Sequence, residues 1–203
     1  MYPHDAAGAA IVLGHGAGAG QGSPFMVRLA RGFADRGVAA ATFDFPYMAE
    51  GRKAPDRAPV LEAAWRQAID AARNAFGPVP LFIGGKSMGG RIASHVAAQG
   101  NAGDIAGLVF FGYPLHPPNK PQQRRDAHLP RIAEPMLFVQ GGRDPFGTGD
   151  EIRELLPSLQ RATLHEIAGG DHSLKVPARA RRGDPVDEAI AAAASWIDRR
   201  GAA

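Results

Sequence analysis

The sequence contains no cysteine, which excludes disulfide bonds, thiolate metal ligands and a cysteine nucleophile. Its apolar runs, such as Leu-Val-Phe-Phe, are far shorter than the roughly 20 apolar residues that a membrane-spanning helix needs. Aromatic residues make up only 7%, and the acidic residues are dispersed among the basic ones, so the basic stripe of a nucleic-acid binder is missing. We therefore expect no membrane, nucleic-acid or metal partner.

The first residues, Met-Tyr-Pro-His-Asp, have neither a basic start nor an apolar stretch. We therefore expect no signal peptide and a cytoplasmic protein. The 203 residues are 45% hydrophobic and 21% charged, which is ordinary for a globular protein and predicts a single domain over residues 1–203. Nothing in the sequence indicates a cofactor or an oligomeric state.

Short apolar runs alternate with helical patterns along the chain. Most of these runs are continuously apolar, which is typical of parallel strands buried on both faces. The expected strands are 10–13, 38–45, 80–84, 105–112, 136–140 and 163–167. The expected helices are 24–36, 58–76, 88–99, 149–156 and 184–199. The alternation predicts an α/β fold, a doubly wound and mainly parallel sheet of about six strands with helices on both faces.

Residues 113–135 interrupt this alternation. The segment is rich in proline, which excludes a long helix. It follows a strand, on the side where α/β proteins bind ligands, and we expect it to roof the site as a stiff cover. His116 and His128 lie within it and are expected at the surface. Because the segment also carries several charged residues, we expect an open site that favours short acyl groups.

The sequence Gly85-Lys86-Ser87-Met88-Gly89 matches G-x-S-x-G between an expected strand and an expected helix. A serine on such a sharp turn takes a strained backbone conformation, and small residues two positions away on each side relieve the crowding. The turn lifts the hydroxyl clear of the sheet and places the following amide at a helix N-terminus, where it can stabilise an oxyanion. Ser87 is therefore the candidate nucleophile.

A serine nucleophile needs a base and an acid that orients the base. His172 lies just after the last expected strand, and Asp144 lies just after the preceding one. Asp171 is adjacent to His172, and sequence neighbours rarely orient each other's side chains. The chain order Ser87, Asp144, His172 is the order expected for an α/β-hydrolase.

Two phosphate-binding motifs compete with this interpretation. Residues 85–87 resemble the end of a P-loop, but Pro80 stands where that motif needs its first glycine. The loop 14–20 matches G-x-G-x-x-A after a strand, and Asp44 lies where an acid that binds ribose would sit. Against this alternative, the loop continues to Ser23 before a helix begins, whereas a dinucleotide loop opens its helix directly.

On these motifs, together with Tyr-Pro-Leu-His-Pro-Pro and Gly-Gly-Arg-Asp-Pro-Phe-Gly, the chain resembles the α/β-hydrolase superfamily over nearly its full length. It looks closest to small, capless, dienelactone-hydrolase-like members, in the branch that includes the hydrolase-like domain of the third NSL-complex subunit. Two departures stand out. Dienelactone hydrolases use a cysteine nucleophile, and the first two antiparallel strands of the superfamily have almost no sequence here.

The resemblance implies an oxyanion loop after the first strand. The backbone amide of Ala17, or that of Gly18, would pair there with the amide of Met88. We expect Gly18 and Tyr113 to contact the substrate. Lys86 is unusual beside a nucleophile and is interpreted as the partner of a nearby carboxylate.

The favoured hypothesis is therefore a serine hydrolase that acts on a small-molecule ester or a related acyl bond through an acyl-enzyme on Ser87. Two alternatives stay open. One is a catalytically silent scaffold with the same fold, and the other is a nucleotide-binding protein that uses the 14–20 loop.

Overall fold

Six parallel strands form one sheet in the order β2-β1-β3-β4-β5-β6. The computed structural model describes residues 1–2, 7–180 and 182–201. All six expected strands are present: β1 Ala9–Gly14, β2 Val38–Phe43, β3 Leu81–Lys86, β4 Gly107–Phe111, β5 Met136–Gly141 and β6 Ala162–Ile167. The predicted minimal, doubly wound α/β fold without a cap is confirmed.

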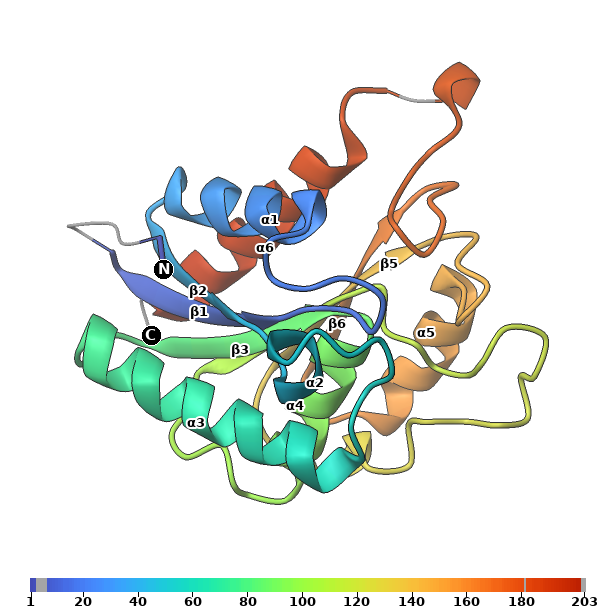
Figure 1. Cartoon of the computed structure of the whole chain (residues 1–203). Helices are drawn as coiled ribbons and strands as arrows, with labels where there is room; N and C mark the ends of the chain where they lie inside the picture. Colours follow the sequence, from blue (N-terminus) through green and yellow to red (C-terminus); the bar gives the residue numbers. More distant parts are fainter. Residues whose placement is uncertain (3–6, 181, 202–203) are drawn as a thin grey trace.

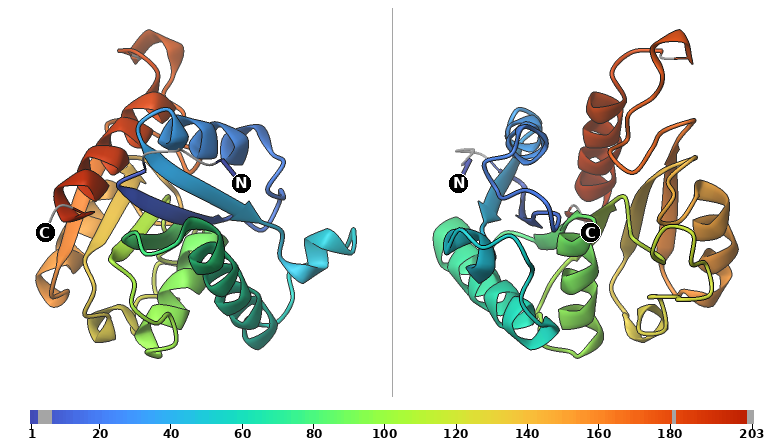
Figure 2. Two further views of the ribbon diagram at one scale, coloured as in Figure 1. Left: turned by 90° about the vertical axis from the view of Figure 1, so that its left-hand side faces the viewer. Right: turned by 45° about the vertical axis from the view of Figure 1, so that its right-hand side comes forward.

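Helices cover both faces of the sheet (Figures 1 and 2). On one face α1 packs against α6, and on the other α3 packs against α4, with α5 on β5 and β6. The helices are α1 Pro24–Ala34, α2 Pro46–Ala49, α3 Ala58–Phe76, α4 Met88–Ala98, α5 Gly149–Leu155 and α6 Pro185–Gly201. Short 3₁₀ turns add η1 Leu129–Arg131, η2 Leu156–Ser158 and η3 Ala178–Ala180. No helix in the described part of the chain is both long and apolar enough to cross a bilayer.

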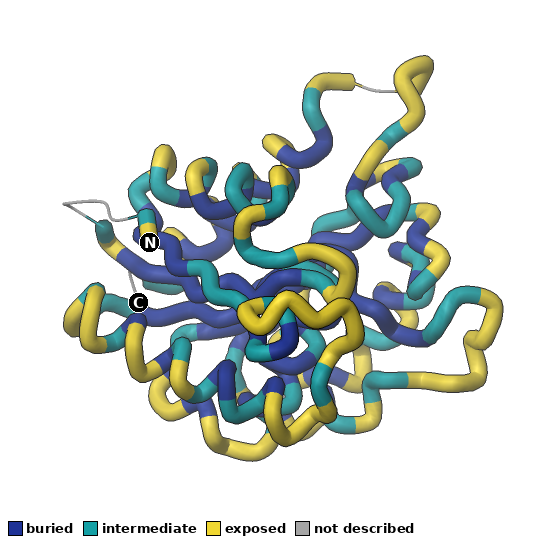
Figure 3. Tube along the Cα trace, viewed as in Figure 1, coloured by how far each residue is buried: buried dark blue, intermediate teal, exposed yellow. Residues whose placement is uncertain are grey.

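The central strands are dark along their length in Figure 3 because both of their faces are covered. Along β4, Leu108 and Phe110 face the core under α3 and α4, while Val109 and Phe111 face the core under α1 and α6. All four side chains are completely buried. A continuously apolar strand is thus the sequence pattern that a sheet covered on both faces requires.

The chain changes direction across the sheet between β1 and β3. From β1 it moves outward through α1 to β2, and it then returns through α3 to β3 on the other side of β1. Two neighbouring strands whose connections diverge leave a crevice at their carboxyl ends. The fold therefore places the loops after β1 and β3 at a shared crevice, with the loops after β5 and β6 at the same edge of the sheet.

Candidate active site

Ser87 stands alone between the end of β3 and the start of α4. Its φ of 49° lies in the left-handed region, which is strained for a residue with a side chain. Its amide donates to the carbonyl of Phe111 on the next strand at 3.1 Å, which holds the turn against the sheet. The strained conformation expected for G-x-S-x-G is therefore present.

The glycines beside Ser87 are required by a close backbone approach. A Cβ built on Gly85 or on Gly89 would lie 2.1 Å from the carbonyl oxygen of Gly14 at the end of β1. The Trp65 indole on α3 donates to the carbonyl of Gly89 at 3.0 Å, which ties the first turn of α4 to α3. The position of Ser87 is thus set by main-chain contacts that leave no room for a methyl group.

The structure brings Ser87, His172 and Asp144 together in one hydrogen-bonded chain. His172 Nε2 lies 2.9 Å from Ser87 Oγ, and His172 Nδ1 lies 2.8 Å from Asp144 Oδ2. A carboxylate only accepts hydrogen bonds, so Nδ1 carries the imidazole proton and Nε2 is left to accept the serine proton. The hydrogen-bond pattern therefore assigns His172 the tautomer that a general base needs.

Asp144 is completely buried and fully hydrogen-bonded. Its Oδ1 accepts from the amide of Phe146 at 2.8 Å, and its Oδ2 accepts from Gln140 Nε2 at 3.0 Å as well as from His172. Asp171 instead accepts from the amides of Ser173 and Lys175 in its own turn. The acid that orients His172 is therefore Asp144 and not its neighbour in sequence.

The two residues expected to supply an oxyanion hole line the same cleft as Ser87. Met88 is the first residue of α4, and Ala17 lies in the loop after β1; both line the cleft. Within the described residues, neither amide donates a hydrogen bond to a protein acceptor. Amides at a helix start carry partial positive charge, and such a pair can hold an oxyanion.

His15 shapes the loop that carries Ala17, a role that the sequence did not reveal. The His15 ring is fully buried, and burial lowers its pKa, which keeps it neutral. Its Nε2 accepts from the amide of Phe45 at 3.1 Å, so its Nδ1 carries the proton and donates to the carbonyl of Gly16 at 2.8 Å. The Tyr47 hydroxyl adds a bond of 3.0 Å to the carbonyl of Ala17.

Asp44 belongs to the same loop system and is already engaged. Its carboxylate accepts from the amide of Gln21 at 2.7 Å and from the side chain of Gln21 at 3.1 Å. These bonds tie the 14–20 loop to the end of β2. An acid that binds the loop itself is poorly placed to bind a ribose, which weighs against the nucleotide-binding alternative.

Lys86 reaches the histidine loop from the end of β3. Its Nζ donates to the backbone carbonyl of His172 at 2.5 Å. Gly112 leaves the necessary room, because a Cβ there would lie 2.9 Å from both Nζ and that carbonyl. Burial lowers the pKa of Lys86 to about 8, against the opposing charges of Asp144 and Asp171. The predicted carboxylate pairing is wrong: within the described residues Lys86 forms no ion pair.

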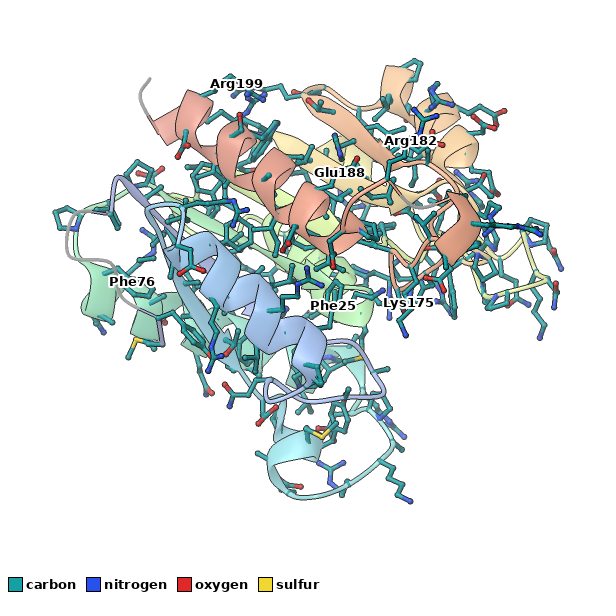
Figure 4. All side chains as sticks on the ribbon, turned by 90° about the horizontal axis from the view of Figure 1, so that it is seen from above. Phe25, Phe76, Lys175, Arg182, Glu188 and Arg199 are labelled. Carbon is teal, nitrogen blue, oxygen red and sulfur yellow. The ribbon has the colours of Figure 1, made fainter. Side chains whose placement is uncertain are left out.

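A cleft of about 860 Å³ opens over Ser87 and His172. Gly18 is among the lining residues, and its contact with a substrate stays a prediction. The walls of the cleft are largely apolar and come from segments far apart in the chain; among their residues are Phe25, Met26, Pro55, Leu61, Ile92, Phe146 and Val186. Figure 4 shows Phe25 of α1 and Lys175 of the loop after β6, both of which line the cleft. Within the described residues, no cluster of three His, Asp or Glu side chains could hold a metal ion.

Three expectations about residues 113–135 are wrong. Tyr113 does not contact the cleft: it is completely buried, and its hydroxyl donates to the carbonyl of Arg125 at 2.9 Å. The segment does not roof the site either, since it contributes only Pro114 and Arg125 to the cleft lining. The expected preference for short acyl groups was inferred from that roof. It stays a prediction, and the roof no longer supports it.

The third error concerns two histidines that were expected at the surface. His116 is only 5% exposed, and its Nε2 lies 3.0 Å from Glu151 on α5. His128 is half-buried, with its Nε2 2.7 Å from Ser94 Oγ on α4. Each of these side chains bonds the segment to a neighbouring helix. Such bonds help to hold the segment in place, because a proline-rich stretch of this length forms few backbone hydrogen bonds of its own.

Comparison with known proteins agrees with this architecture. A family model described as "Alpha/beta hydrolase domain" matches residues 7–199. A dienelactone hydrolase from Anabaena variabilis superposes with a TM-score of 0.74 at 20% identity, over 98% of this chain and 88% of that one. Est1E from Butyrivibrio proteoclasticus, with ferulic acid bound, gives 0.73 at 15% identity over 96% and 90%. A putative alpha/beta hydrolase of unknown function from Agrobacterium tumefaciens gives 0.74 at 18% over 98% and 88%.

Proposed function

The chain belongs to the alpha/beta hydrolase domain family, and from this premise we propose that it is a serine hydrolase of an ester or related acyl bond. The observation that carries the proposal is the chain of hydrogen bonds from Asp144 through His172 to Ser87, with Ser87 at the floor of a cleft. Its substrate is a small molecule that the cleft can enclose, and the chemistry needs only protein side chains, backbone amides and water.

The first half-reaction forms an acyl-enzyme. Ser87 Oγ attacks the carbonyl carbon of the ester while its proton passes to His172 Nε2. The carbonyl oxygen becomes an oxyanion that accepts hydrogen bonds from the amides of Ala17 and Met88. The intermediate collapses, the bond to the alkoxy oxygen breaks, and the alcohol leaves with the proton from His172.

The second half-reaction releases the acid. A water molecule attacks the acyl carbon while His172 accepts one of its protons, and the same two amides hold the second oxyanion. Collapse breaks the bond to Ser87 Oγ, which takes the proton back from His172. Asp144 stays ionised throughout and stabilises the imidazolium that forms in each step.

The test is labelling with a fluorophosphonate probe followed by peptide mass spectrometry. We expect a covalent adduct on the peptide that holds Ser87, and no adduct in Ser87→Ala. A folded protein that stays unlabelled and hydrolyses no p-nitrophenyl ester would contradict the proposal and favour the catalytically silent scaffold. Labelling at any other serine would contradict the assignment of the nucleophile.

A further inference from the structure

Two arginines line the cleft without a carboxylate partner. Arg91 lies on α4 and Arg125 in the 113–135 segment, and neither forms an ion pair with any residue that the structure describes. The third arginine of the lining differs in this respect. Arg28 also lines the cleft, but its guanidinium lies 2.8 Å from both Asp184 and Asp187. Among the arginines of the cleft lining, Arg91 and Arg125 are therefore the two without an ion-pair partner in the described part of the chain.

Arg91 is the less solvated of the two unpaired arginines. Its Nε is buried and has no hydrogen-bond partner among the described residues. Burial lowers the pKa of Arg91; the nearby Tyr113 opposes this effect, and the charge of Arg125 adds to it. Two guanidinium groups that repel each other in a half-buried wall are unfavourable unless an anion comes between them.

Among the described residues, the one carboxylate in the cleft lining does not supply that anion. Asp56 accepts from Arg52 at 2.7 Å and from the amide of Tyr47 at 3.0 Å, so its charge is already compensated. Asp126, which follows Arg125 in sequence, is bound by Arg124. Among the described residues, no carboxylate pairs with Arg91 or Arg125, which leaves both guanidinium groups open to an anion that enters the cleft.

Arg91 is also close to the reacting serine along the helix. Its amide donates to the carbonyl of Ser87 at 3.0 Å, so the two residues are one helical turn apart on the same face. Four residues of helix rise about 6 Å, and both Ser87 and Arg91 line the cleft. Arg91 therefore belongs to a cleft wall near the serine to which an acyl group would be attached.

We infer that Arg91 and Arg125 form an anion subsite for the acyl part of the substrate, so that the preferred ester carries a carboxylate a few bonds from its scissile carbonyl. This inference rests on the proposed function. Each guanidinium offers a planar fork of N–H donors that matches a carboxylate. The exposed Lys175 on the opposite rim adds positive charge that attracts an anionic substrate.

The test compares two esters of equal length. One is p-nitrophenyl hexanoate, and the other is p-nitrophenyl hydrogen adipate, which differs by a terminal carboxylate. After subtraction of the rate without enzyme, we expect a higher kcat/KM for the adipate ester, and a preference that shrinks at high salt because salt screens charges. Equal or lower kcat/KM for the adipate ester would overturn the subsite.

Variants identify the arginines responsible. Arg91→Gln should lower the adipate-to-hexanoate ratio about tenfold or more, as expected for the loss of a charge-assisted hydrogen bond, with Arg125→Gln acting in the same direction. Arg91→Lys keeps the charge but loses the fork, so the ratio should fall only part of the way. Arg31→Gln removes an exposed arginine of α1 outside the cleft and should leave the ratio unchanged. A ratio that is the same in all variants would overturn the assignment.

Binding without turnover separates this inference from the proposed function. Calorimetry with monomethyl adipate on Ser87→Ala, which cannot form the acyl-enzyme, measures the subsite even if neither p-nitrophenyl ester is cleaved by the wild type. Binding to Ser87→Ala that is lost in the double variant Ser87→Ala/Arg91→Gln supports the subsite, and an absence of binding overturns it. Competition by inorganic phosphate that is stronger than competition by adipate would also overturn the assignment of a carboxylate.

Discussion

Two serine–histidine pairs, one just before the first residue of α4 and one within that helix, look alike by distance alone. Ser87 Oγ lies 2.9 Å from His172, and Ser94 Oγ lies 2.7 Å from His128. The two pairs differ in where their protons point. Ser94 donates to the carbonyl of Arg91 at 2.6 Å, so His128 Nε2 must donate to Ser94 rather than accept from it. A proton on that nitrogen leaves no base for the serine.

The surroundings of the two pairs differ as well. Ser94 is completely buried, whereas Ser87 lines the cleft. Behind His172 stands the carboxylate of Asp144, but the neighbour of His128 is the ring of His95, with centroids 4.4 Å apart. A short Ser–His distance is therefore not evidence of a nucleophile. The evidence is an accessible serine, a free imidazole nitrogen and an acid that holds the other nitrogen.

The sharpest test of this comparison removes each serine in turn. Ser87→Ala should lower kcat for p-nitrophenyl esters by about five orders of magnitude or more, because no nucleophile remains. Ser94→Ala, the matched control on the same helix, should keep kcat within a few-fold of the wild type. A large loss of kcat in a folded Ser94→Ala protein, with activity retained in Ser87→Ala, would reverse the roles of the two pairs.

The next largest effect concerns the acid. Asp144→Asn should lower kcat by about four orders of magnitude, because an amide favours the imidazole tautomer that cannot accept the serine proton. Asp171→Asn is the control, since its side-chain oxygen can still accept from the amides of Ser173 and Lys175. Steady-state kinetics on both variants checks the assignment, which fails if the Asp171 variant is the more damaged one.

A smaller effect on activity is expected from Lys86. Its ammonium binds the loop that carries His172. Lys86→Met should lower kcat/KM about tenfold, because His172 loses the ammonium that binds its carbonyl. The pKa of Lys86 is near 8, so the ammonium is present below that pH and is lost above it. We expect an alkaline decline in wild-type kcat/KM near pH 8 that is absent from Lys86→Met. The same decline in both proteins would exclude Lys86 as its origin.

The smallest effect is on the free energy of unfolding and arises at the Ser94–His128 pair. Burial, followed by the charges of His95 and Arg131, lowers the pKa of His128 to about 4 from an ordinary value of 6.5. Between these values the unfolded chain takes up the proton first, so the free energy of unfolding should fall as the pH falls from 6.5 toward 4. Urea denaturation across this range should show a shallower decline in His128→Gln, and an identical decline would contradict the assignment.

Sequence patterns predicted the sheet and the residues at its edge for a physical reason. The strand ends were visible as changes from apolar runs to Gly-rich turns, and parallel strands bring those turns to one edge. Ser87, Asp144 and His172 follow three such ends, which is why their proximity could be predicted. The strand expected at 38–45 is two residues too long, since β2 ends at Phe43. Asp44 and Phe45 already belong to the following loop, where they bind Gln21 and His15.

What the sequence could not predict depends on contacts between distant segments. Tyr113 and His128 look like loop residues, and they are buried because their segment packs against α4. The partner of Lys86 is a backbone carbonyl, and a carbonyl has no residue type by which it could be found in a sequence. Arg91 did have a signal, since it lies four residues after Ser87 on an expected helix and therefore on the same face.

The close approach between β1 and the start of α4 divides the site into a part that cannot vary and a part that can. Gly85 and Gly89 meet the Gly14 carbonyl so closely that even alanine would displace the nucleophile. The cleft walls at Phe25, Pro55 and Leu61 belong to other segments and make no such contact with the turn. A designer who wants a new substrate should therefore randomise the walls and leave the turn untouched, and divergence among natural relatives is open to the same route.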